Sequence, residues 1–212
     1  YKPRVDREIL QEFSEGIIAL SACLAGEVAT KLRAGFYEEA KQAALEHQKI
    51  FGKDNYFLEL QDHKIPEQTV VNQGLMRLHE ETGIPLVATN DIHYVKKEDW
   101  MAHDILLCIQ TNKKVSDEDR MRYAQGQFYL KSPEEMEALF PYAHEAIENT
   151  EKIAKRCNVE IVFGEQKLPK FEVPEGFTSE TYLRKLCQDG LEKRYDTITD
   201  ELQNRLNYEL ST

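Results

Sequence analysis

Short apolar runs alternate with amphipathic stretches through the first half of the chain. Three of these runs have the length of buried strands and fall at 16–20, 56–60 and 85–89. The amphipathic stretches predict helices at 27–32, 37–50, 67–81 and 98–110. Strands that alternate with helices of this length predict βαβ units and a mainly parallel sheet, covered on both faces. The pattern therefore indicates an α/β fold, and by itself it fits a barrel as well as an open sheet.

The second half of the chain is more helical. A polar stretch at 111–125 predicts a loop, and 128–130 predicts a short strand. Ser132 is then followed by Pro133 and by Glu135, the spacing of a capping box that opens a helix. The remaining segments are predicted as helices at 143–157, 179–195 and 199–210, with an extended linker at 168–174.

Composition excludes several classes of protein. No apolar run reaches the roughly 18 residues that a transmembrane helix needs, and no signal-peptide pattern opens the chain. The four cysteines are far apart and form no C-x-x-C pair, which favours a reducing cytoplasm over a secreted disulfide scaffold. The formal net charge of −11 argues that these 212 residues are not a main DNA-gripping surface.

The sharpest chemical signal is Asp91 and His93. They follow a buried strand directly, at the strand end where α/β proteins bind their ligands. Side chains at i and i+2 of an extended segment share one face, and a carboxylate beside an imidazole suits Zn²⁺ or Mn²⁺. The alternative is structural, with Asp91 capping a turn and His93 packed beneath Tyr94.

Cys23 is the second signal, because it also lies between a strand and a helix. Its thiolate could complete the same site if the two strands are neighbours. The alternative is a small buried hydrophobic residue, the commoner role of a free cysteine. Two histidines are weaker candidates: His63 is expected to lie in a solvated loop, and His103 is expected on a helix surface or in packing.

Eight collinear stretches resemble the alpha-subunit family of bacterial DNA polymerase III. They are PRVDREIL, EGIIALSACLAGEVA, YFLELQDH with IPEQ, PLVATNDIHY, AHDILLCIQT, FYLKSPEEM, ENTEKIAKRCNV, and LPKFEVPEG with YLRKLCQDGLEKRY. Any one of them is modest evidence, whereas the full series in one order is specific.

The resemblance implies a PHP (polymerase and histidinol phosphatase) domain. In that family it is a distorted βα barrel whose strand ends gather metal ligands, and the family's late motifs fall on Cys23, Asp91 and His93. Its early His-x-His pair has no counterpart here. We therefore expect residues 1–160 to be the C-terminal part of a PHP domain, a partial barrel, and residues 161–212 to begin the palm region of the polymerase core.

The resemblance also implies a function for the parent protein. That function is DNA-directed DNA polymerisation in the cytoplasm, with Zn or Mn at the PHP site and Mg at palm aspartates outside this chain. The implied partners are DNA, deoxynucleoside triphosphates, the sliding clamp, other replicase subunits and a proofreading exonuclease subunit, with no membrane. The PHP domain is expected to add 3′–5′ exonuclease activity or to serve as a scaffold. A stand-alone phosphoesterase is a third possibility, and we expect these 212 residues alone to be inactive.

Overall fold

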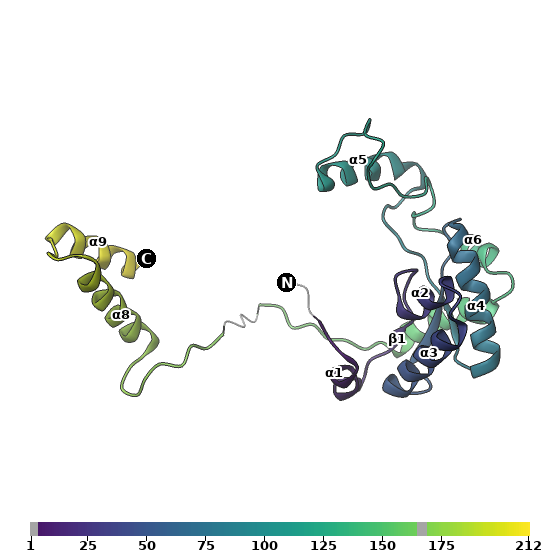
Figure 1. Cartoon of the computed structure of the whole chain (residues 1–212), viewed down its shortest axis with the longest axis horizontal. Helices are drawn as coiled ribbons and strands as arrows, with labels where there is room; N and C mark the ends of the chain where they lie inside the picture. The colour runs from purple at the N-terminus through teal and green to yellow at the C-terminus, as the bar shows by residue number, and fades with distance from the viewer. Residues whose placement is uncertain (1–3, 165–168) are drawn as a thin grey trace. The chain divides into compact units, whose positions relative to one another are not determined.

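The computed structural model describes residues 4–164 and 169–212. The chain divides into two compact units, Tyr1–Val159 and Glu160–Thr212 (Figure 1). The first unit contains the sheet and every candidate site residue, and the second is helical.

A small parallel sheet lies in the first unit. Its strands, in the spatial order β1-β2-β3, are β1 (Ala19–Leu20), β2 (Tyr56–Leu60) and β3 (Leu86–Ala88). Leu20 pairs with Phe57, and Leu60 pairs with Ala88, both in parallel register. All three residues of β3 are buried. Because successive strand residues face opposite sides, both faces of β3 are covered, as the continuous apolar runs predict.

In chain order, the helices of the first unit are α1 (Arg7–Glu12), α2 (Glu27–Arg33), α3 (Tyr37–Phe51), α4 (Pro66–Thr82), the 3₁₀ turn η1 (Lys97–Asp99), α5 (Trp100–Thr111), α6 (Pro133–Leu139) and α7 (His144–Arg156). Helices α2 and α3 connect β1 to β2, α4 connects β2 to β3, and the other helices of the first unit lie before β1 or after β3. The helices predicted in this part of the chain are confirmed, with small differences at their ends. The predicted capping box is also confirmed: Ser132 Oγ accepts from Glu135 N at 3.2 Å, and the Glu135 carboxylate accepts from Ser132 N at 2.9 Å.

Small side chains bring the helices close together. The buried face of α3 consists of Ala40, Ala43 and Ala44, each no more than 3% exposed. On α4, a Cβ built at Gly74 would lie 2.8 Å from a Leu32 methyl group of α2. Glycine at this position therefore permits α2 and α4 to pack as they do.

The chain returns to the sheet through α7. Asn149 on this helix is buried, and its Nδ2 donates to Leu86 O of β3 at 2.8 Å. Ala146, one turn earlier, is fully buried. The hydrogen bond satisfies a strand carbonyl that has no further strand beside it among the described residues.

The α5 lobe, which we define as residues 97–127, lies apart from α2, α3 and α4 (Figure 1). It consists of η1, α5 and the irregular segment 112–127, which matches the loop predicted for 111–125.

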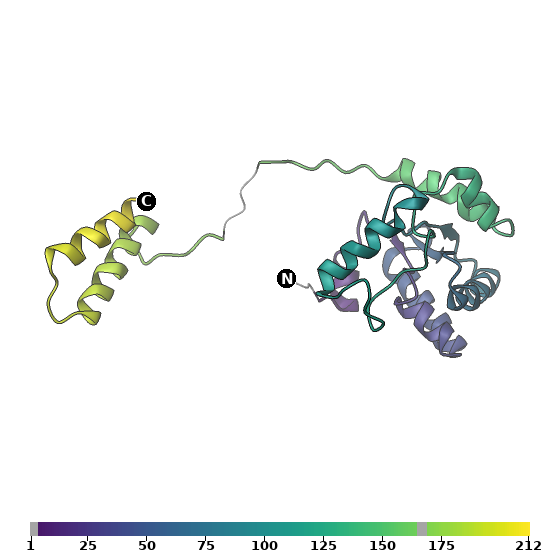
Figure 2. The same ribbon diagram turned by 90° about the horizontal axis from the view of Figure 1, so that it is seen from above.

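The second unit contains α8 (Ser179–Arg194) and α9 (Asp200–Ser211), which lie side by side (Figure 2). Gln203 Nε2 donates to Gln188 Oε1 at 3.2 Å between them. Both helices were predicted. The predicted linker has neither helix nor strand over 169–174, and Leu168 lies outside the described residues.

Three predictions need correction or stay open. The first strand is two residues long, not five, because Gly16 adopts a positive φ of 74° that interrupts extended backbone. The strand predicted at 128–130 is wrong: only an isolated parallel bridge joins Tyr129 to Tyr94. The distorted barrel is not confirmed, since the described residues form a three-stranded sheet that does not close.

Candidate metal centre at the strand ends

Three polar loops meet at one edge of the sheet. Because the strands are parallel, their carboxyl ends lie together at this edge. Residues 21–23 follow β1, residues 61–63 follow β2, and residues 89–93 follow β3. Cys23 and Asp91, from the two outer strands, line one cleft together with Gln61 and Gln68.

Glu59 of the middle strand ties the two outer loops together. Its Oε2 accepts a hydrogen bond from Ala22 N at 3.1 Å, and its Oε1 accepts one from Thr89 Oγ1 at 2.5 Å. Its own backbone N–H donates to Ser21 Oγ at 2.8 Å. Sequence reasoning missed Glu59. The signal that could have found it is a lone carboxylate near the carboxyl end of an otherwise apolar strand.

The loop that carries Cys23 is tight and strained. Ala22 has a positive φ of 65°, which costs a residue with a Cβ about 1 kcal/mol or more. A Cβ at Gly26 would overlap the backbone oxygen of Ser21, so only glycine fits there. The loop presents Cys23 as an exposed free thiol.

Asp91 and His93 lie together. His93 Nε2 is 3.1 Å from Asp91 Oδ1, and their side chains are 29% and 43% exposed. The backbone around them is fixed by a neighbouring segment: His93 N donates to Phe128 O at 2.8 Å, and Phe128 N donates to Tyr94 Oη at 3.1 Å. The two side chains therefore share one face and stay partly accessible.

His63 is buried, so the expectation of a solvated loop histidine is wrong. It is 1% exposed, and its ring stacks on Phe128 with centroids 4.3 Å apart. His63 N donates to Gln68 Oε1 at 2.7 Å, which turns the Gln68 amide so that its Nε2 faces His63 Nδ1 at 3.1 Å. Nδ1 is then the acceptor, and the ring proton sits on Nε2. Burial lowers the pKa of His63, and the nearby Lys131 lowers it further.

An aromatic cluster surrounds His93. Its ring centroid is 4.6 Å from that of Tyr123 and 5.2 Å from that of His103. Burial lowers the pKa of His103, and the neighbouring His93 lowers it further. The sequence predicts that His103 lies on a helix surface or in packing, and in the structure its ring packs against those of His93 and Tyr123.

The chemistry of the three predicted ligands fits a transition metal, while their geometry supplies only part of a site. A thiolate, a carboxylate and an imidazole all bind Zn²⁺. Asp91 and His93 are in contact, and Cys23 lines the same cleft as Asp91. Within residues 4–164 and 169–212, however, no three His, Cys, Asp or Glu side chains converge closely enough to hold a metal ion.

The chain is similar to known proteins over almost its whole length. It is 46% identical over 211 residues to DNA polymerase III subunit alpha of Treponema pallidum, covering 99% of this chain and 18% of that protein. It is 43% identical over 213 residues to the same subunit of Borreliella burgdorferi, covering 100% and 18%. For Thermus aquaticus the identity is 44% over 206 residues, covering 94% and 17%. The chain is homologous to the DNA polymerase III alpha subunit.

The resemblance inferred from the sequence is therefore confirmed. The sequence model of the PHP domain matches residues 1–63, which include Cys23 but neither Asp91 nor His93. The chain spans about 18% of the length of the first two alpha subunits. Assigning residues 1–160 to the PHP domain and 161–212 to the polymerase core stays a prediction. Among the described residues of this alpha-subunit homologue, no helix has the length and apolar character to cross a membrane.

Proposed function

We propose that this chain is part of a DNA polymerase III alpha subunit that carries out DNA-templated nucleotidyl transfer, and that its strand-end cleft is a metal-dependent 3′–5′ exonuclease site. The observation that carries the second part is the Asp91–His93 pair, 3.1 Å apart, beside a cleft that Cys23 also lines. A carboxylate, an imidazole and an exposed thiol at the ligand-binding edge of a parallel sheet favour metal chemistry over packing.

Each side chain has a role in this proposal. Asp91, His93 and Cys23 would hold the metal through a carboxylate, an imidazole and a thiolate. A bound Zn²⁺ or Mn²⁺ would supply Lewis-acid activation for phosphodiester hydrolysis. Glu59 holds the Cys23 and Asp91 loops at a fixed separation through Ala22 and Thr89.

The substrates and partners of the parent protein are proposed from its homology. They are DNA and deoxynucleoside triphosphates, with Mg²⁺ at a polymerase site outside these 212 residues. The sliding clamp, other replicase subunits and a proofreading exonuclease subunit complete the proposed set.

A scaffold role is the second candidate. The observation that favours it is a row of apolar side chains on α5: Met101, Ile105 and Ile109 are 60%, 50% and 71% exposed. Residues spaced by four lie on one helix face. An apolar face of this kind suits contact with another part of the replicase. The stand-alone phosphoesterase has no such support, because similarity to polymerase subunits runs through 99% of the chain.

Metal content tests the site. The 212-residue chain, purified without chelator, is compared with Asp91→Asn and with Asp62→Asn, a carboxylate at the same sheet edge that pairs with Lys64. Metal retained in the wild type and Asp62→Asn, and lost in Asp91→Asn, supports the assignment. Equal metal in all three refutes it.

Nuclease activity separates the exonuclease from the scaffold. Full-length alpha subunit is incubated with single-stranded DNA labelled at its 3′ end, with and without Asp91→Asn. Release of the label that Asp91→Asn abolishes, with primer extension intact, supports the exonuclease. A chelator that lowers the melting temperature of a protein with no detectable label release supports the scaffold.

A further inference from the structure

A second pocket adjoins the strand-end cleft, on the α5 lobe. Its walls include three aromatic rings, Tyr94, Trp100 and Tyr123, and two guanidinium groups, Arg120 and Arg122. The two cavities share Arg122, Tyr123 and Ala124, so one short segment separates them. Tyr123 also contacts His93, with ring centroids 4.6 Å apart.

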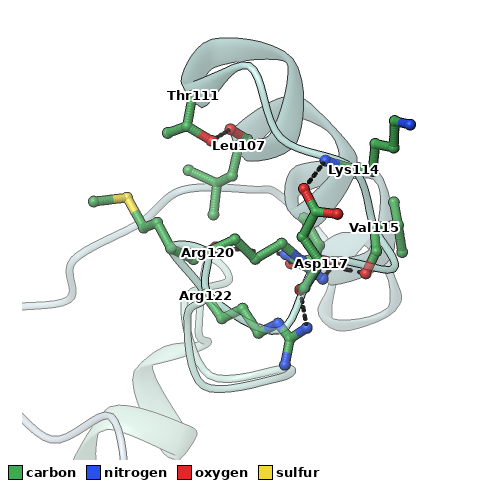
Figure 3. Close-up of polar contacts among 9 residues, drawn as sticks. Leu107, Thr111, Lys114, Val115, Asp117, Arg120 and Arg122 are labelled. Carbon is green, nitrogen blue, oxygen red and sulfur yellow. Dashed lines mark hydrogen bonds and ion pairs between the residues drawn. The ribbon is translucent and has the colours of Figure 1, made fainter.

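The two arginines differ in how their charge is used. Arg120 is held by both oxygens of Asp104, at 2.6 and 2.7 Å, and its side chain is only 5% exposed. That pair builds the pocket wall and carries no spare charge. Within the part of the chain that the structure describes, Arg122 donates to one acceptor, the backbone carbonyl Asp117 O, at 2.9 Å (Figure 3). No carboxylate of a described residue forms an ion pair with it, and its side chain is exposed.

Two carboxylates act on or lie beside Arg122, and each has another hydrogen-bond partner. Asp104 interacts with the charge of Arg122 but is paired with Arg120. Asp117 turns its carboxylate to Lys114 N, at 2.9 Å (Figure 3). Among the described residues, Arg122 is thus the guanidinium of this pocket that forms no pair with a carboxylate, and its planar fork suits phosphate oxygens.

The rings supply the other half of a binding site. Aromatic faces beside a guanidinium are the combination on which nucleic-acid bases stack while their phosphate is held. Tyr94 is fixed in place, because its hydroxyl accepts from Phe128 N at 3.1 Å. The chain carries a net charge of −11, yet the segment from Asp91 to Lys131 has as many basic as acidic residues. An anion therefore meets less repulsion here than over the chain as a whole.

We propose that this pocket binds a single nucleotide, with its base against Trp100 and Tyr123 and its phosphate on Arg122. The role of the pocket rests on the proposed exonuclease. The pocket would hold the nucleotide that adjoins the phosphodiester bond to be cleaved at the Asp91–His93 edge. Binding itself is independent of metal and of turnover.

Trp100 is the only tryptophan in the chain, so its fluorescence reports on this pocket alone. The chain is titrated, with chelator present, with thymidine 5′-monophosphate, thymidine and inorganic phosphate. We expect the monophosphate to quench Trp100 with a midpoint at least about tenfold lower than either of the others. Arg122→Gln should raise the monophosphate midpoint about tenfold and leave that of thymidine unchanged.

Two variants make the result specific. Lys113→Gln removes one positive charge from an exposed residue of the same lobe that does not line the pocket, and it should bind as the wild type does. Arg122→Lys keeps the charge without the fork and should fall between wild type and Arg122→Gln. If Arg122→Gln does not fold, Arg122→Lys still tests whether the guanidinium binds the phosphate.

Three outcomes would overturn the proposal. They are no quenching at about 10 mM monophosphate, equal midpoints for monophosphate and phosphate, or the same loss in Lys113→Gln as in Arg122→Gln. Because chelator is present throughout, a chain that lacks metal can still bind the nucleotide. Failure of the exonuclease proposal is then distinct from failure of this one.

Discussion

Thr89 Oγ1 donates to Glu59 Oε1 at 2.5 Å, across the boundary between β3 and β2. The other oxygen of the same carboxylate accepts from Ala22 N, in the loop after β1. One side chain on the middle strand thus spans both outer loops, and those loops carry Cys23 and Asp91. The separation of the proposed metal ligands depends on a residue that is not itself a proposed ligand.

Replacing Glu59 should destabilise the first unit. Glu59→Ala leaves the partly buried Thr89 Oγ1 and the exposed Ala22 N–H without their acceptor, which should lower the free energy of unfolding by about 1 kcal/mol or more. Glu59→Gln can keep the bond to Ala22 and should cost less. Denaturant unfolding followed by circular dichroism measures both.

The control is Glu148→Ala, which removes a carboxylate that is 67% exposed and pairs with Lys152 one turn along its own helix. Surface pairs of this type contribute little. If Glu59→Ala is no more destabilising than Glu148→Ala, the bridging role assigned to Glu59 is wrong.

The sequence revealed the parts of the site that depend on local geometry. Asp91 and His93 could be paired because side chains two residues apart on extended backbone share a face. Glu59 could not be found in this way, since its partners Ala22 and Thr89 come from other parts of the chain. The sequence predicts that His63 lies in solvent, because loops after strands are usually exposed, whereas in the structure the ring of Phe128 stacks on it and covers it.

The limits of the fold prediction have the same cause. Helix ends depend on caps, and a capping box such as that of Ser132 is visible in the sequence. Strand pairing depends on distant segments. The apolar run at 16–20 has strand composition, but only two of its residues pair with β2, beyond the turn at Gly16. The pocket on the α5 lobe depends on the ion pair between Arg120 and Asp104, and no periodic pattern in the sequence predicts that contact.

Gly74→Ala should destabilise the chain even though alanine is the better helix former. Alanine gains about 1 kcal/mol of helix propensity. Its Cβ would lie 2.8 Å from a Leu32 methyl group, however, and crowding in a packed core costs about 1–3 kcal/mol. Gly190→Ala is the matched control, because its Cβ would meet only the flexible end of Arg194. It should increase the helicity of the second unit.

A double variant identifies the cause. Leu32→Ala removes the methyl groups that the new Cβ at position 74 would meet, so adding Gly74→Ala to Leu32→Ala should cost less than Gly74→Ala does alone. Additive effects in unfolding experiments would show that crowding between α2 and α4 is not the reason.

His63 should make stability depend on pH near neutrality. Burial lowers the pKa of His63 below its ordinary value of 6.5, so the folded protein resists protonation that the unfolded chain accepts. The unfolded state then binds more protons, and stability falls as pH drops below about 6.5. The unfolding midpoint in urea should decrease between about pH 7.5 and about pH 5.5.

Two variants test whether His63 is the cause. His63→Gln should show a shallower decrease of the midpoint with pH, whatever its absolute stability. His144→Gln, at an exposed position, should keep the wild-type slope, and a wild-type slope in His63→Gln would contradict the assignment.

The last prediction concerns the ion pair that shapes the pocket wall. Arg120 lowers the pKa of Asp104 by hydrogen bonding, so the pair is present at neutral pH and is lost only as pH falls below the ordinary aspartate value of 3.8 towards the lowered one. Asp104→Asn removes the charge at any pH and leaves Arg120 almost buried without its partner. Amide exchange of the α5 lobe, measured by mass spectrometry at neutral pH, should become about tenfold faster or more. Exchange of α3 should stay unchanged, because the α5 lobe lies apart from it (Figure 1).

Asp119→Asn is the control. It removes an exposed charge from the same loop and should leave both segments as in the wild type. Faster exchange in both variants would mean that the net charge of the loop, and not the Arg120–Asp104 pair, holds the lobe together.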